Sequence, residues 1–240
     1  MIIDYNYSPI LEDFTKEKTL KLSSILKILL NSGNKHSDLA DDNILAGSSS
    51  GIAWILSDWF IEVLDYPKYG SEIVAKTWTE PVSQIFCCMR DFELYADGKL
   101  AAHGLTKWVL LDLNTGRPKK IEQSLIDKYG PENKTTFETS KLAKLLEPQS
   151  FIQETSLKVR RSDIDFNGHV HNLTYLDYAL EALPQEKYDS QQNFKKLRIS
   201  FKADLKQGDE INCCYAECEN SSVIQIFTGD KKIATQIELS

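Results

Sequence analysis

One short stretch of the sequence gathers residue types that do acid–base chemistry. Residues 161–172 read Arg-Ser-Asp-Ile-Asp-Phe-Asn-Gly-His-Val-His-Asn and hold two carboxylates, two imidazoles and two amides. A carboxylate or an imidazole can move a proton, an amide can orient it, and N–H groups at a helix start can hold an oxyanion. The alternative is a capping loop in which Asp and Asn form turns. That alternative explains Asp163, Asp165 and Asn167 but leaves the histidines unexplained.

This loop leads into a predicted helix, which a series of predicted strands follows. The spacing of apolar residues predicts a helix from about Val170 to Leu183, ending at Pro184. A helix followed by a strand meander is typical of an antiparallel sheet packed on that helix. The expected strands of this half are Leu157–Arg160, Leu197–Leu205, Ile211–Glu219, Val223–Thr228 and Ile233–Leu239.

The first half of the chain repeats this order. Apolar residues at three- and four-residue spacing predict a helix over Thr19–Asn34, with Gly33 suited to its C-cap. Residues from about Asn114 to Ser150 are rich in Pro, Gly and polar side chains and predict a linker, with a short helix near Lys141–Leu146. The strands expected before it are Ile52–Leu64, Ile73–Thr79, Ile85–Tyr95 and Leu100–Leu111.

The two halves match at an offset of 150 residues, which suggests a diverged duplication. Leu20 aligns with Val170, and Ser24 aligns with Thr174. A sheet wrapped around one long apolar helix would bury that helix completely. We therefore predict an α+β fold with two domains, residues 1–130 and 151–240, joined by a linker at 131–150.

The composition is that of an ordinary globular chain. Of the 240 residues 42% are hydrophobic and 26% are charged, which excludes the disordered, collagen and coiled-coil classes. The net charge of −7 argues against a nucleic-acid partner. No apolar run reaches the ~18 residues of a membrane helix. Residues 1–6 lack the pattern of a signal peptide, so we expect no membrane partner.

The five cysteines predict a reducing compartment. Their number is odd, and four of them form adjacent pairs, whose side chains would point to opposite faces of a strand. Neither pair is therefore expected to form a disulfide or to share a metal ion. We predict reduced, packed thiols in a cytoplasmic protein that needs neither a metal nor a cofactor. The cysteines are Cys87, Cys88, Cys213, Cys214 and Cys218.

The loop and the helix after it resemble a known family, the acyl-acyl carrier protein thioesterases. That family's pattern is Asp-x-Asn-x-His-Val-Asn-Asn, then Tyr, then Glu-x-x-Pro, and it is matched by residues 162–172, Tyr175 and 181–184. The resemblance covers nearly all of the chain and implies a tandem hotdog fold, with an antiparallel sheet around a central helix in each half. Further landmarks are Trp54–Leu56, Tyr66-Pro67-x-x-Gly70, Thr77-Trp78 and Trp108–Asp112.

The resemblance also implies a site. The family's catalytic set falls on Asp165, Asn167 and His169, and a further carboxylate falls on Asp204, where the family usually has glutamate. We expect backbone N–H groups near Gly168 and Val170 to hold the oxyanion. His171 stands where the family usually has asparagine.

Leu205 stands where some plant members have a cysteine, so we favour attack by water over a thiolate. The sequence leaves open whether Asp165 activates that water or attacks directly. Strict alternation along the strand would turn Asp204 outward, unless a bulge or the strand's end redirects it.

The first half lacks this set of residues. At the offset of 150, Thr15, Glu17 and Thr19 stand in place of the catalytic set, so one site per chain is expected. The remaining histidines, His36 and His103, are interpreted as structural.

Two basic clusters interrupt the acidic background. Such clusters usually form a solvated face, but they could also steer an acidic carrier protein to the site. The candidate docking residues are Arg160, Arg161, Lys195, Lys196 and Arg198, with Lys158 and Lys202 beside them.

The function implied by the resemblance is hydrolysis of fatty acyl-acyl carrier protein, releasing free fatty acid during fatty acid biosynthesis. The alternatives are an acyl-coenzyme A thioesterase and a non-catalytic acyl-binding module. The expected partner is acyl carrier protein, and the chain is expected to be a monomer or a homodimer.

Overall fold

The computed structural model describes residues 1–42 and 51–240. These residues form two compact units, Met1–Leu142 and Ala143–Ser240. The division falls inside the stretch predicted as a linker. Within the described residues, no helix is both long enough and apolar enough to span a membrane.

The first unit packs an antiparallel sheet on one long helix, α1 (Leu22–Leu39). The hydrogen-bonded strand order is β1-β3-β4-β5-β2, with β6 paired to β5. α1 is buried because its apolar residues surround most of its circumference, and Ile25, Ile28 and Leu29 have no exposed surface. The other elements are β1 (Ile3–Tyr7), β2 (Ile52–Val63), β3 (Ile73–Thr79), β4 (Cys87–Ala96), β5 (Lys99–Asp112), β6 (Arg117–Pro118) and α3 (Gln123–Asp127).

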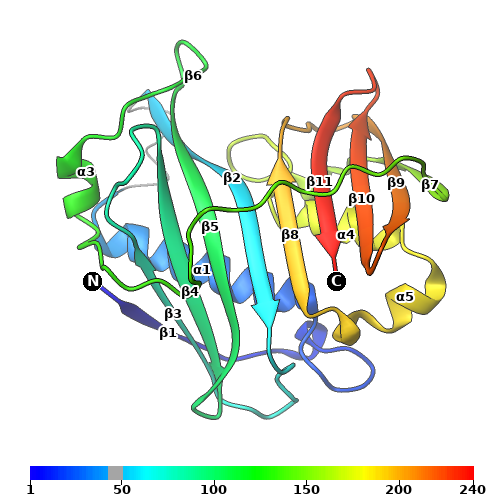
Figure 1. The fold of residues 1–240 in the computed structure, drawn as a ribbon, viewed down its shortest axis with the longest axis horizontal. Coiled ribbons are helices and arrows are strands. Elements are labelled where there is room, and N and C mark those ends of the chain that lie inside the picture. The colour runs from blue at the N-terminus through cyan, green and yellow to red at the C-terminus, as the bar shows by residue number, and fades with distance from the viewer. Residues whose placement is uncertain (43–50) are drawn as a thin grey trace. The chain divides into compact units, whose positions relative to one another are not determined.

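The second unit repeats this arrangement with a shorter helix, α4 (Thr174–Glu181). Its antiparallel sheet has the order β8-β11-β10-β9-β7, and α4 packs against β10 and β11. Figure 1 shows this sheet in yellow to red, with α4 behind it. The other elements are β7 (Gln153–Lys158), α5 (Gln185–Asp189), β8 (Lys196–Phe201), β9 (Glu210–Cys218), β10 (Ser221–Thr228) and β11 (Ile233–Leu239).

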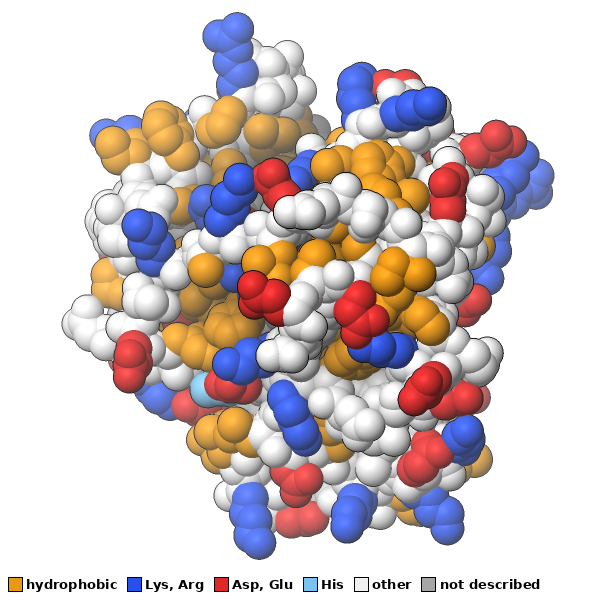
Figure 2. Space-filling view, turned by 45° about the vertical axis from the view of Figure 1, so that its right-hand side comes forward, with side chains coloured by type: hydrophobic (Ala, Val, Ile, Leu, Met, Phe, Trp, Pro, Cys, Tyr) orange, Lys and Arg blue, Asp and Glu red, His pale blue; other side chains and the backbone are white. Residues whose placement is uncertain are grey.

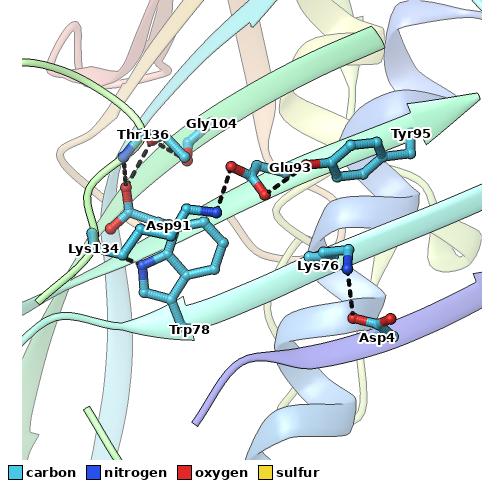
Figure 3. Close-up of polar contacts among 9 residues, drawn as sticks. All are labelled: Asp4, Lys76, Trp78, Asp91, Glu93, Tyr95, Gly104, Lys134 and Thr136. Atoms are coloured by element: carbon cyan, nitrogen blue, oxygen red, sulfur yellow. Dashed lines mark hydrogen bonds and ion pairs between the residues drawn. The ribbon is translucent and has the colours of Figure 1, made fainter. Parts of the chain in front are cut away.

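The first part of the predicted linker packs against the sheet of the first unit. Its part from 132 to 140, called the strap here, covers the sheet face opposite α1. Thr136 donates its backbone N–H and its hydroxyl to Asp91 Oδ1, each at 2.7 Å, and the Trp78 indole donates to the Lys134 carbonyl at 2.6 Å. Lys134 also pairs with Glu93 at 2.7 Å (Figure 3).

The helix predicted at Lys141–Leu146 is wrong, because this stretch is extended and its backbone binds side chains of the second unit's sheet. The Ala143 carbonyl accepts a hydrogen bond from Arg198 at 3.1 Å. The Leu146 N–H donates to Glu238 at 3.3 Å, and the Leu146 carbonyl accepts from the Gln236 amide. The sheet thus satisfies backbone groups that a helix would have paired internally.

Both predicted helices have different ends in the structure. Gly33 is not a C-cap, because α1 continues to Leu39. Gly33 lies buried in the helix, where an added Cβ would sit 3.5 Å from the side chains of Arg90 and Phe92. In the second unit, the helix begins at Thr174 and not at Val170. A turn precedes it, in which the Thr174 N–H donates to the His171 carbonyl at 2.9 Å.

Candidate active site

The loop at 161–172 folds as a tight turn closed by a small antiparallel ladder. Ile164 and Val170 form a bridge, and the Asp165 N–H donates to the His169 carbonyl at 2.8 Å. The Gly168 N–H donates to the Asp165 carbonyl at 3.1 Å, with Gly168 at φ 81°. A residue without Cβ takes this left-handed conformation without strain. The ladder brings Asp165 and His169 side by side.

The Asp165 carboxylate organises this turn. Its Oδ1 accepts the Asn167 N–H at 2.8 Å and the His169 N–H at 3.2 Å, which fixes the orientation of the carboxylate. Its second oxygen, Oδ2, takes part in neither bond. Asp165 and His169 are half-buried, while Asn167 is exposed. The three predicted side chains therefore lie within one turn, and a polar reactant has access to them from solvent.

Asp163, two residues before Asp165, anchors the loop to α4 through Tyr178. Its carboxylate accepts the Arg160 N–H at 2.8 Å and the Tyr178 hydroxyl at 2.6 Å, and it pairs with the Arg160 guanidinium at 2.9 Å. Burial alone would raise the pKa of Asp163, but the hydrogen bonds from Arg160 and Tyr178 outweigh it and lower that pKa. Asp163 is thus a buried, ionised anchor. Its signal in the sequence is Asp13, the carboxylate that the first half keeps at the same offset.

The first unit contains the same turn without the side chains predicted to be catalytic. The Thr15 N–H donates to the Thr19 carbonyl at 2.8 Å, and Lys18 takes the left-handed conformation at φ 63°. The Thr15 and Thr19 hydroxyls bond to each other at 2.9 Å. The two turns share a backbone conformation, so the difference between them lies in the side chains.

Asp204 lies on the connection after β8, beyond the end of the strand. The Lys202 and Ala203 N–H groups both donate to the Ala234 carbonyl, and this irregularity ends the alternation that would have turned Asp204 outward. Its neighbour Leu205 accepts the Val170 N–H at 3.0 Å and donates its own N–H to the Tyr175 hydroxyl at 3.1 Å. The predicted strand Leu197–Leu205 is therefore too long, and Asp204 is an exposed residue on a segment tied to the loop.

The electrostatics agree with this placement. Burial raises the pKa of Tyr175, and the negative charges of Asp204 and Asp165 raise it further. Both carboxylates are therefore within electrostatic range of the same buried hydroxyl.

The expected oxyanion donors at Gly168 and Val170 are not free. The Gly168 N–H donates to Asp165, and the Val170 N–H donates to Leu205. The expectation assumed that α4 begins at Val170, which would have left its first N–H groups unpaired. Because α4 begins later, this part of the prediction is wrong for the structure described here.

All five cysteines are free, and the burial of four of them disfavours the thiolate form. Cys87, Cys88, Cys213 and Cys214 are buried. Burial raises the pKa of the Cys88 and Cys213 thiols to about 12. A thiol in this state is a poor nucleophile at neutral pH. No group of three or more His, Cys, Asp or Glu side chains among the described residues is arranged to hold a metal ion.

The other two histidines have structural partners. His36 Nδ1 accepts from Arg90 at 3.1 Å, so its Nε2 carries the hydrogen that is donated to the Tyr129 carbonyl at 3.0 Å. Burial, with a contribution from the Arg90 charge, lowers the pKa of His36 to about 4. His103 pairs with Glu62 at 2.9 Å and lies against the Phe137 ring of the strap.

The candidate docking cations do not form one cluster. Arg160 is paired with Asp163, and Arg198 holds the Ala143 carbonyl. Lys196 begins β8, whose opposite end leads to Leu205 and the loop, so it lies about 16 Å along the strand from Phe201. Arg161 is exposed next to the loop.

Both halves of the chain match models of one protein family. Residues 3–129 match the model of the acyl-ACP thioesterase N-terminal domain, and residues 146–238 match that of the C-terminal domain, where ACP is acyl carrier protein. The chain belongs to the acyl-ACP thioesterase family. The resemblance expected from the loop motif is thereby confirmed.

Curated relatives of the family are similar at low identity. The chain is 27% identical over 190 residues to oleoyl-acyl carrier protein thioesterase 2 of Arabidopsis thaliana, covering 74% of this chain and 51% of the relative. It is 26% identical over 149 residues to a palmitoyl-acyl carrier protein thioesterase of Cuphea hookeriana, covering 59% and 35%. The chain thus spans about half the length, or less, of these relatives.

Solved structures confirm the predicted fold class. An acyl-ACP thioesterase from Bacteroides thetaiotaomicron has a TM-score of 0.84 at 22% identity, over 99% of this chain and 96% of that one. A 12:0-ACP thioesterase from Umbellularia californica has a TM-score of 0.88 at 15% identity, over 100% and 96%. The fold is a tandem hotdog, with a sheet around a helix in each half.

Proposed function

We propose that this chain hydrolyses the thioester of fatty acyl-ACP and releases free fatty acid, as a step that ends chain elongation. The observation that carries the proposal is the difference between the two turns. The two turns have the same backbone conformation, but the second half carries Asp165, Asn167 and His169, while the first half carries Thr15, Glu17 and Thr19. Membership of the acyl-ACP thioesterase family supports the choice of reaction.

In the proposed reaction, water adds to the thioester carbonyl carbon and the carbonyl electron pair moves onto oxygen. The oxygen electron pair then reforms the carbonyl and the carbon–sulfur bond breaks, and the proton lost by water reaches the departing thiolate, which leaves as the carrier's thiol. Asp165 would act through Oδ2, either as a base toward water or as a nucleophile, since Oδ1 accepts two N–H groups of the turn. His169 and Asn167 would orient water and thioester, and Asp204 would supply a second carboxylate.

The buried thiols favour this route over a cysteine nucleophile. Leu205 fills the position of a cysteine found in some plant members, and it is fully buried. The Cys88 and Cys213 thiols are held in their protonated form. Water, with carboxylate assistance, is therefore the proposed attacking group.

We propose acyl carrier protein as the partner and Arg161 as the docking cation nearest the loop. Carrier docking at Arg160, Lys195, Lys196 or Arg198 has less support, since Arg160 and Arg198 bind groups of the protein, and Lys195 and Lys196 lie at the end of β8 away from the loop. Figure 2 shows acidic and basic side chains interspersed over the visible face, so attraction of an acidic partner would depend on local cations. We also propose that the chain is located in the cytoplasm and is a monomer or a homodimer.

A substrate comparison tests the proposal. The purified chain is incubated with one acyl group carried either by acyl carrier protein or by coenzyme A, and the free fatty acid is measured. We expect kcat/KM to be higher for the carrier-bound substrate. Hydrolysis of the coenzyme A thioester alone would favour the acyl-coenzyme A thioesterase, and acyl binding without hydrolysis would favour the non-catalytic module.

The docking residue has its own test. Arg161→Glu should raise KM for the carrier-bound substrate and leave hydrolysis of a small neutral thioester unchanged, because the chemistry is untouched. Lys196→Glu, an equal charge change at the far end of β8, is the matched control and should have a smaller effect. Equal effects of the two variants would contradict docking at Arg161.

A further inference from the structure

The sheet of the second unit ends on an edge strand, β7. Among the described strands, β7 pairs only with β9, so one row of its backbone N–H and C=O groups has no strand partner there. Its pairing with β9 keeps a single register from Gln153 to Lys158, without a bulge or a proline. Bulges and prolines are common devices that stop an edge strand from pairing with another chain. β7 therefore has a regular edge to which a further strand could be added.

The exposed side chains of β7 carry opposite charges at a fixed spacing. Glu154, Ser156 and Lys158 are exposed, and because they lie two residues apart they share one face of the strand. In the part of the chain that the structure describes, neither Glu154 nor Lys158 forms an ion pair. Charged side chains often keep an edge strand unpaired, which is the competing explanation for them here.

Two copies of β7 complement each other in one antiparallel register. When both strands are centred on Ser156, residue 154 of each copy lies directly opposite residue 158 of the other, which places Glu154 against Lys158 twice. Opposite charges directly across a strand pair stabilise the pairing. On the other face, Thr155 lies opposite Leu157, so the pairing would cover a half-buried leucine in each copy. A shift by two residues in either direction loses both charge pairs.

The corresponding strand of the first unit lacks this complementarity. β1 aligns with β7 at the offset of 150 residues, and it is the last strand of its own sheet. Its one charged residue is Asp4, which pairs with Lys76 at 3.4 Å, and β1 contains no cation that a second copy could place opposite it. The self-complementary pattern is therefore specific to the second unit and is not a consequence of the shared fold.

We propose that two copies of this chain associate through β7, antiparallel and centred on Ser156, with two Glu154–Lys158 ion pairs across the junction. The partner is a second copy of this chain, and the strands of the two sheets become continuous across the junction. One strand from each copy makes a small interface, so the dimer should dissociate on dilution. The association is independent of the proposed hydrolysis, because none of these residues belongs to the candidate active site.

Charge reversal tests this interface because the interface is symmetric. Glu154→Lys gives each chain two lysines at the junction and Lys158→Glu gives it two glutamates, so both pairs become repulsive in either variant. Sedimentation equilibrium over a range of protein concentrations measures the dissociation constant. We expect the wild-type chain to dimerise and each variant to raise Kd by about tenfold or more. Glu12→Lys, an equal charge change at an exposed residue outside β7, is the matched control for Glu154→Lys and should leave Kd unchanged.

Mixing the two variants separates the interface from damage within one chain. In the mixed pair, the lysines of one chain lie opposite the glutamates of the other, so we expect heterodimers with a Kd close to that of the wild-type dimer. Reversal of Lys158 also places like charge opposite Glu210 in the same chain, but mixing cannot repair a defect of that kind. Thermal unfolding of each variant reports on its fold.

Three results would overturn the proposal. The first is a wild-type chain that stays monomeric at every concentration. The second is a dimer whose Kd neither variant raises, which would place the interface elsewhere on the chain. The third is a mixture of two folded, monomeric variants that forms no heterodimer. Hydrolysis of acyl-ACP is measured separately, so failure of the dimer leaves the proposed function standing, and failure of the hydrolysis leaves the dimer standing.

Discussion

The carbonyl oxygen of Leu205 accepts the backbone N–H of Val170 at 3.0 Å. This bond ties the connection that carries Asp204 to the turn that carries Asp165, although the two segments lie far apart in the sequence. The first unit has the same bond between Leu20 and Pro67, at 2.7 Å. The two halves therefore share the backbone framework of the site, and the side chains of the turn distinguish the second half as the catalytic candidate.

Asp165→Asn should lower kcat on acyl-ACP by at least about 100-fold while leaving the fold intact. The amide oxygen of Asn can still accept the Asn167 and His169 N–H groups, so the turn should survive without its ionisable oxygen. Turnover is compared with that of Glu17→Gln, which removes a carboxylate from the equivalent turn of the first half and should change nothing. A folded Asp165→Asn variant with wild-type turnover would show that the site is elsewhere.

Asp204→Asn should also reduce kcat, by about tenfold or more, if the Leu205 bond brings this carboxylate into the reaction. Steady-state kinetics on acyl-ACP measure the effect. Glu210→Gln, an exposed carboxylate at the start of β9, serves as the control and should behave as wild type. Equal activity of the two variants would place Asp204 among ordinary surface charges.

Tyr175→Phe should lower the free energy of unfolding by about 1–3 kcal/mol, because the buried Leu205 N–H loses its only hydroxyl partner described here. Denaturant unfolding measures the change. Tyr188→Phe removes an exposed hydroxyl and should have no comparable effect. The Tyr175 variant should also lose turnover, since its substitution loosens the connection that carries Asp204. An unchanged free energy of unfolding would contradict this prediction, because water would then replace the hydroxyl as the partner of the Leu205 N–H.

The buried Asp91 beneath the strap should make stability depend on pH. Burial raises the pKa of Asp91, the nearby Glu80 charge adds to that rise, and the two Thr136 hydrogen bonds only partly oppose it. The folded state therefore holds a proton that the unfolded chain has released, so this contribution to stability is lost as pH rises above the ordinary Asp value of 3.8.

Asp91→Asn removes the titration and keeps the acceptor for Thr136. Its unfolding free energy should increase relative to wild type between pH 5 and pH 8. His36 acts in the opposite direction, since its lowered pKa makes the protein less stable as pH falls below 6.5, but both proteins contain it. A difference between the two proteins that stays constant with pH would contradict the account of Asp91.

The thiols should be dispensable for the reaction. Replacing all five cysteines with Ala or Ser should cost stability at the buried positions and leave kcat within a few-fold of wild type, because the thiols of Cys88 and Cys213 are buried and protonated. Activity after treatment with a thiol reagent gives the same test on the native chain. Inactivation traced to a single cysteine would contradict the water mechanism.

Local sequence patterns predicted much of the fold. The strands at Ile73–Thr79 and Ile233–Leu239 have the predicted bounds. The predictions failed where tertiary contacts decide the structure. Lys141–Leu146 has a helical pattern, yet side chains of β8 and β11 hold it extended. Gly33 looked like a helix end, whereas it allows α1 to lie close to β4.

The candidate site was predicted in its side chains but not in its backbone. Residue types and spacing marked the loop, and the resemblance to the family singled out Asp165, Asn167 and His169 within it, which the turn does place together. The start of α4 was predicted four residues early, because apolar spacing cannot distinguish a turn from the first turn of a helix. That error led to the expectation of free backbone donors at Gly168 and Val170, whose N–H groups are paired within the protein.

The measurement that tests the central claim most directly is product analysis with purified chain and acyl-ACP in water enriched in oxygen-18. Thioester hydrolysis predicts free fatty acid and free carrier thiol in equal amounts over many turnovers, with label in the carboxylate, and predicts that Asp165→Asn forms neither at a comparable rate. Intact acyl-ACP after prolonged incubation with the folded wild-type chain, or equal product formation by both proteins, would contradict the account.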